Sequence, residues 1–167
     1  MKIHFKIRRD LLREVRRDLA RPHSFAAERV GFMAAGFSST ADELAVLARG
    51  YRGVSDEDYL PDHSVGAMMG PEAIRKAVQW ATSEGVGMFH VHAHHGRGHP
   101  RFSGVDLREQ AKFVPNFFEY APQCAHGALV LSDVFAYGHI WLGDDRPYDV
   151  VTRFVEVGVP LKEWSAL

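Results

Sequence analysis

The sequence predicts an α+β domain in which helices wrap a mixed β-sheet. Short apolar runs typical of buried strands recur along the chain, and segments with the spacing of amphipathic helices lie between them. The two kinds of segment do not alternate regularly, which favours an α+β architecture over a doubly wound parallel sheet. A chain of 167 residues is long enough to bury one core, so we expect a single domain over residues 1–167.

The first half of the chain begins with a predicted strand and a predicted helix. Residues 1–7 alternate as in a short strand, whereas residues 9–20 have apolar positions at helical spacing before Pro22 ends the segment. Two apolar runs, 28–35 and 43–49, predict further strands. The first half therefore supplies three strands and one helix to the expected sheet.

The second half begins with a polar segment, 51–70, which we interpret either as an ordinary loop or as a substrate-recognition insertion. A helix is predicted after Gly70 because Pro71 suits a first helical turn. Later expected elements are a buried strand over 85–91, a helix over 105–113, and strands over 127–131, 139–142 and 152–157. Four aromatic residues are assigned to the core: Phe113, Phe117, Phe118 and Tyr120.

Composition gives no indication of a nucleic-acid or membrane partner. The 20 Lys and Arg residues are balanced by 21 Asp and Glu residues. The basic run 6–17 interleaves with leucine and valine at helical spacing, so we interpret it as a solvated helix face. The single cysteine, Cys124, fits a reducing cytoplasm, and we interpret it as a buried thiol rather than a nucleophile activated by His126. We expect a cytoplasmic protein without a membrane-spanning segment.

A histidine-rich segment carries the chemistry that the sequence predicts. Five of the ten histidines lie between His90 and His99, and Asp106 follows them. Neutral imidazoles with one carboxylate are the ligands of catalytic zinc sites. Alternate residues of a strand point to the same face, so both rings of an H-x-H pair can reach one ion. A metal-free surface histidine cluster is the simpler alternative.

The predicted zinc ligands are His92, His94 and Asp106, which leave one coordination position for water. His90 with His92 satisfies the same alternation and is the alternative pair. Glu28 begins a strongly apolar segment, which is unusual for a charged residue, and we expect it to act as the base for the attacking water. The alternative for Glu28 is a strand-edge residue that faces solvent.

Ser103 has two interpretations of similar weight. Its hydroxyl could donate a hydrogen bond to an oxyanion, or it could cap the helix predicted to begin near residue 105.

Taken in order, Glu28, His92-Ala-His94 and Ser103-Gly-Val-Asp106 resemble the E…H-x-H…S-x-x-D signature of JAB/MPN (JAMM) metallopeptidases. The flanking segments resemble the prokaryotic JAB branch, and the resemblance covers residues 9–142. The loop between His94 and Ser103 is one residue longer than is usual in the family, and His95 stands where proline is common.

The resemblance implies a cytidine-deaminase-like fold and a Zn²⁺-dependent isopeptidase or peptidase. His92, His94 and Asp106 would bind zinc with a water, Glu28 would move the proton, and Ser103 would stabilise the oxyanion. The implied substrate is a ubiquitin-like β-grasp protein, cleaved after its C-terminal glycine, with its tail extended along a sheet edge.

The biological setting that the resemblance implies is a bacterial gene cluster with E1-like and E2-like enzymes, in some cases for antiphage defence. The protease would process a ubiquitin-like precursor or remove the protein from its conjugates. The alternatives are a non-catalytic MPN-type scaffold and a metal-dependent hydrolase with a different kind of substrate.

Overall fold

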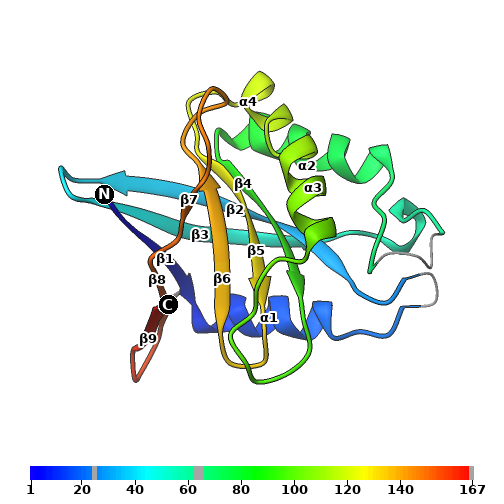
Figure 1. The fold of residues 1–167 in the computed structure, drawn as a ribbon, viewed down its shortest axis with the longest axis horizontal. Helices are drawn as coiled ribbons and strands as arrows, with labels where there is room; N and C mark the ends of the chain where they lie inside the picture. Colours follow the sequence, from blue (N-terminus) through cyan, green and yellow to red (C-terminus); the bar gives the residue numbers. More distant parts are fainter. Residues whose placement is uncertain (24–25, 62–65, 166–167) are drawn as a thin grey trace.

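The computed structural model describes residues 1–23, 26–61 and 66–165, and nine strands within these ranges form one mixed β-sheet (Figure 1). The strands are β1 (Lys2–Arg8), β2 (Val30–Ser39), β3 (Glu43–Gly53), β4 (Gly87–Ala93), β5 (His126–Leu131), β6 (Ala136–Trp141), β7 (Asp149–Val150), β8 (Arg153–Val157) and β9 (Lys162–Ser165). The helices are α1 (Arg9–Leu19), α2 (Pro71–Glu84), α3 (Gly104–Phe113) and α4 (Asn116–Tyr120), with a short 3-10 helix at Asp56–Asp58.

The strand order across the sheet is β7-β6-β5-β4-β2-β3-β1-β8-β9. The β1/β3, β1/β8 and β4/β5 pairs are parallel, and the other neighbouring pairs are antiparallel. Sequence neighbours are therefore often separated in space, as β1 is from β2. This mixed sheet with helices packed on it confirms the α+β class that the sequence predicts.

The sheet has two buried faces. On one face α1 packs against alternate residues of β1, β3, β4 and β5 to form what we call the α1-side core. On the other face α2 and α4 pack on β2 and β4 to form the α2-side core. Alternation in β2 shows the division, because Phe32 and Ala34 belong to the α2-side core while Met33 and Ala35 belong to the α1-side core. Figure 1 shows α1 well apart from α2, α3 and α4.

The predicted helices form close to their predicted bounds. The apolar stripe of α1 (Leu11, Leu12, Val15 and Leu19) is buried, so the part of the basic run from residue 9 to 17 is the polar side of an amphipathic helix, as expected. The prediction is wrong for Lys6 and Arg8, which belong to strand β1. Pro71 occupies the first turn of α2, and Gly85 in the left-handed conformation ends that helix. None of the described helices is long and apolar enough to cross a membrane.

Several strand boundaries differ from the sequence predictions. The strand expected over 28–35 begins at Val30 and continues to Ser39, so Glu28 precedes the strand. The strand expected over 85–91 is β4, which includes His92. Strand β6 begins three residues before the predicted 139, whereas α4, β7 and β9 were not predicted. These three elements have five, two and four residues, too few for a periodic pattern to develop.

Only some of the four aromatic residues assigned to the core are buried. Phe117 and Phe118 are buried, and the partly buried Phe113 packs against the two apolar clusters to which they belong. Tyr120, at the end of α4, is 52% exposed, so its assignment to the core is wrong. A five-residue helix turns only part of its surface toward the sheet, and Tyr120 falls on the other part.

We expect Phe89→Ala to lower the free energy of unfolding by about 3–5 kcal/mol, because this ring is fully buried in the α1-side core. Its edge-to-face contact with Phe5, with ring centroids 5.3 Å apart, would also be lost. Urea denaturation of the wild type and the variant measures the difference. Tyr120→Ala is the control, with an expected cost below about 1 kcal/mol for an exposed ring. Equal costs in the two variants would contradict the assigned core.

Candidate metal centre

Three predicted metal ligands converge at the end of β4 that adjoins α3. The Nε2 atoms of His92 and His94 lie 3.3 Å apart, and Asp106 Oδ2 lies 3.5 Å from the first and 3.6 Å from the second. The His92 side chain is 2% exposed, against 31% for His94 and 22% for Asp106. The donors thus form a nearly equilateral triangle with one side open to solvent.

Strand geometry explains why the two histidines face the same way. His92 lies within β4, two residues after His90 and four after Met88, whose side chain belongs to the α2-side core. His94 lies one residue beyond the strand, but its backbone N–H still donates to the carbonyl of Leu131 in β5 at 2.9 Å. This bond continues the ladder, so the alternation of side chains extends through His94.

The start of α3 fixes the position of the carboxylate. Asp106 Oδ2 accepts a hydrogen bond of 2.7 Å from the backbone N–H of Ser103, and Ser103 Oγ accepts one of 3.2 Å from the backbone N–H of Asp106. Ser103 is therefore the N-cap of the helix, which was one of its two interpretations. It also lines the pocket described below, and the hydroxyl hydrogen is not used in the cap.

The environment of Asp106 favours the ionised form that a metal ligand must have. Burial raises the pKa of Asp106, but the hydrogen bond and charge interaction with His92, together with the bonds to Ser103, outweigh it. The pKa of the carboxyl therefore lies well below its ordinary value.

Glu28 joins the same site from the loop before β2. One carboxylate oxygen of Glu28 and one ring nitrogen each from His92 and His94 all lie within 4.8 Å of one another. The side chain is half-buried, so the alternative of a solvent-facing residue at a strand edge does not describe it. Three separate segments of the chain thus bring residues 28, 92, 94 and 106 together.

Two neighbours hold Glu28 in place. Its backbone N–H donates to the carbonyl of Gly66 at 2.9 Å, and a Cβ added to Gly66 would lie 2.8 Å from Glu28 Oε2. The adjacent Arg29 is 5% exposed and donates to the carbonyls of Arg21 and Pro22 and to Asp56. Sequence reasoning missed both neighbours, because nothing in their local pattern identifies the partners they meet.

The donor set fits a zinc ion. Donors bound to one tetrahedral zinc at about 2.0–2.1 Å lie roughly 3.3–3.4 Å from one another. The observed separations of 3.3, 3.5 and 3.6 Å are close to this value. Two imidazoles and a carboxylate are also the ligand types that catalytic zinc sites use. Glu28, His92 and His94 form a group that can hold a metal ion, and Asp106 lies against the two histidines.

The ligands border a pocket of about 530 Å³ beside α3. Its lining includes Glu28, His90, His92, His94, Ser103, Asp106 and Gln110. Apolar walls come from β2, the segment after residue 65, α2 and α3, through Val30, Met68, Met69, Ile74 and Phe113. The end of the 51–70 segment is therefore a wall of the site, and positions 62–65 of that segment lie outside the described residues.

The other histidines of the segment have different surroundings. His90 lines the pocket, but the group that can hold a metal, as found among the described residues, does not include it. Burial lowers the pKa of His90 to about 3, so its ring is neutral near pH 7. His99 stacks on Phe135 with ring centroids 3.8 Å apart, and His95 is exposed. Neither His95 nor His99 lines the pocket.

Cys124 and His126 do not form a nucleophile–base pair. Nδ1 of His126 accepts from the backbone N–H of Met88 at 3.1 Å, and its Nε2 lies 3.0 Å from the carbonyl of Ala121. Both ring nitrogens are therefore engaged with backbone. Burial raises the pKa of the Cys124 thiol, as expected for an inert cysteine.

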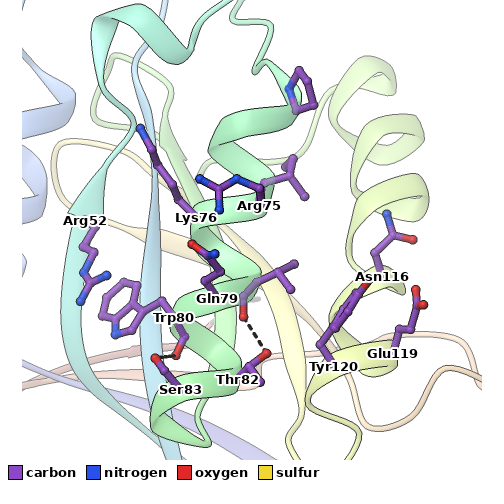
Figure 2. A pocket seen from close by; sticks show the side chains of 13 residues that line it. Arg52, Arg75, Lys76, Gln79, Trp80, Thr82, Ser83, Asn116, Glu119 and Tyr120 are labelled. Atoms are coloured by element: carbon purple, nitrogen blue, oxygen red, sulfur yellow. Dashed lines mark hydrogen bonds between the residues drawn. The ribbon is translucent and has the colours of Figure 1, made fainter.

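A larger depression of about 1020 Å³ lies along α2 and α4, and it has no comparable constellation (Figure 2). The hydroxyls of Thr82 and Ser83 are bonded to carbonyls of their own helix, as the dashed lines in Figure 2 show. Lys76 Nζ contacts Asp58 at 2.6 Å, and Arg52 lies over the ring of Trp80 at 4.1 Å. These four side chains thus have partners within the chain, and the cluster of metal-ligating side chains lies in the smaller pocket.

Comparisons with known proteins add no assignment. No protein-family model matches the chain, and a search of curated proteins finds no significant match.

We expect His92→Ala and Asp106→Ala to lower bound zinc well below one equivalent per chain, because each removes one of three converging donors. Zinc retained after dialysis, measured by atomic absorption, checks this. His95→Ala is the control and should keep full occupancy, since His95 is exposed and outside the pocket. Full occupancy in either ligand variant would contradict the ligand set.

Proposed function

We propose that the chain is a JAMM-type zinc metallopeptidase of the prokaryotic JAB/MPN branch. It would cleave the peptide or isopeptide bond after the C-terminal glycine of a ubiquitin-like β-grasp protein. The observation that carries the proposal is the meeting of Glu28, His92, His94 and Asp106 at one pocket, with Ser103 at the start of the adjoining helix. These are the residues of the E…H-x-H…S-x-x-D motif, and they come together from three separate segments.

Each group of the site has a separate role in the proposed hydrolysis. A bound zinc ion would supply Lewis-acid activation of a water molecule and of the scissile carbonyl. Glu28 accepts a proton from the attacking water as the new C–O bond forms. The same carboxyl then donates that proton to the amine as the C–N bond breaks. The free hydroxyl hydrogen of Ser103 points to a role as donor to the developing oxyanion.

The proposal includes a biological role for the protease. Such a protease would trim a ubiquitin-like precursor or release the protein from conjugates made by E1-like and E2-like enzymes in the cytoplasm. The apolar walls of the pocket favour an uncharged peptide tail over a charged ligand.

We expect wild-type protein loaded with zinc to remove a short C-terminal extension from its ubiquitin-like substrate, and Glu28→Gln to lose about 10²–10⁴-fold of that rate. Glutamine keeps the size of the side chain but cannot accept the proton. The assay is intact mass spectrometry against a panel of ubiquitin-like proteins that carry short extensions.

The zinc content of Glu28→Gln is measured in parallel. Retained zinc with lost cleavage supports the role of base, whereas lost zinc would make Glu28 a ligand. Cleavage that is equal in both proteins would contradict the mechanism. A protein that binds zinc and the ubiquitin-like partner but cleaves none of the panel would instead fit an MPN-type scaffold.

We expect Gly66→Ala to slow cleavage by about 10²-fold while zinc content stays unchanged, because the added methyl group would displace the Glu28 carboxylate. Steady-state rates with the same substrate measure the effect. Gly98→Ala is the matched control, since a Cβ at Gly98 would meet nothing within 4 Å. An unchanged rate in Gly66→Ala would show that the position of Glu28 does not limit the reaction.

A further inference from the structure

Two polar residues lie on the same faces of β4 and α3 as the proposed metal ligands. His90 precedes His92 by two residues on β4, so both rings lie on the same face of the sheet. Gln110 follows Asp106 by four residues on α3, so both side chains lie on the same face of the helix. Both His90 and Gln110 line the pocket that contains the metal ligands. The pocket therefore has a second polar pair beside the metal centre.

The groups of this second pair lack partners. Gln110 is 3% exposed, and neither its Nε2 nor its Oε1 has a hydrogen-bond partner among the described residues. The same is true of His90 Nε2. A buried polar group left unpaired gives up its hydrogen bonds to water without replacing them, so an amide with two such atoms destabilises the protein as long as no ligand is bound. Unpaired buried groups that line a pocket are the groups that a ligand can satisfy.

The surroundings of the pair determine what kind of group fits. The ring of His90 contacts Phe32 and Phe113, with centroids 5.7 and 5.1 Å away, and Val30 and Ala128 line the pocket nearby. A charged group would lose its hydration against these aromatic and aliphatic side chains. The Gln110 amide has one donor end and one acceptor end, and both are free. The complementary group is neutral and carries both an acceptor and a donor.

The volume of the pocket agrees with a second subsite. A metal-ligated water needs about 30 Å³ of space, whereas small organic ligands occupy pockets of about 300–1,000 Å³. The observed volume of about 530 Å³ leaves room for several substrate atoms beyond those that react at the metal.

We propose that Gln110 and His90 form a specificity subsite that binds a neutral amide of the substrate, either a peptide group or a carboxamide side chain. The substrate in this statement is that of the proposed peptidase, on which the inference rests. The subsite itself is a binding site for amides and can be tested without cleavage.

The direct test is a titration of zinc-loaded, ¹⁵N-labelled protein with propionamide, followed through the backbone and side-chain amide resonances, of which the backbone set also reports binding in the variants. The chain has only three glutamines, Gln79, Gln110 and Gln123, so the resonances are easily assigned with variants. We expect the Gln110 pair to shift with a Kd on the order of millimolar, typical of a ligand with five heavy atoms. Butanone has the same shape but lacks the donor, and should bind about fivefold more weakly or worse.

Variants separate this subsite from other binding. Gln110→Leu and His90→Phe should each weaken propionamide binding about fivefold or more while zinc content is retained. Gln79→Leu is the matched control, because Gln79 is exposed on α2 outside the pocket. Binding of propionamide that survives Gln110→Leu unchanged, as expected for ligation to zinc alone, would overturn the proposal. Gln110 resonances that do not move at all, as expected for an amide held by a permanent water, would do the same.

Cleavage kinetics connect the subsite to the reaction. With the substrate identified by the mass assay, Gln110→Leu should raise KM about fivefold or more and leave kcat nearly unchanged, because the subsite binds a part of the substrate that does not react. An unchanged KM would overturn its role in substrate recognition. If wild-type protein cleaves nothing, the proposed peptidase fails, while the propionamide titration still decides whether the amide subsite exists.

Discussion

The arrangement of the site depends on the pairing of β4 with its two neighbours. His92 is opposite Val30 in β2 on one side and Val130 in β5 on the other, so hydrogen bonds on both edges fix its register. The bond from the His94 backbone to Leu131 continues that ladder beyond the strand. A shift of one residue would turn His92 into the α1-side core and remove the candidate ligand pair, so the pairing of the strands also determines the candidate metal centre.

The two carboxylates reach the histidines by different means. Asp106 is oriented by the cap of α3, and the hydrogen bond it accepts from Ser103 helps to keep it ionised. Glu28 is positioned by the chain on either side of it, through its bond to Gly66 and through the anchoring of Arg29. A helix cap is a rigid support, whereas the support of Glu28 depends on close contact between two loops. This difference suits the roles proposed for them, a fixed metal ligand and a base that exchanges a proton.

Much of the fold could be predicted from the periodicity of apolar residues. The strand ends and short elements that were predicted wrongly or missed have a common cause. The helices α1, α2 and α3 have apolar stripes, a suitable proline or a serine cap, which are local signals. Strand ends depend on neighbours, which is why β2 begins after Glu28 and β4 extends through His92. The short elements α4, β7 and β9 form because longer elements support them, and no pattern in their few residues distinguishes them from loops.

The donor types, their order and the alternation that puts His92 and His94 on one side could be predicted from the amino-acid sequence, because they depend on residues close together in the chain. Three features depend on the packing of distant segments: Glu28 and Asp106 lie beside the two histidines, Gly66 leaves no space for a side chain next to Glu28, and the Gln110 amide lies unpaired in the same pocket. Contacts between segments tens of residues apart depend on strand order and helix packing, for which local spacing carries no information.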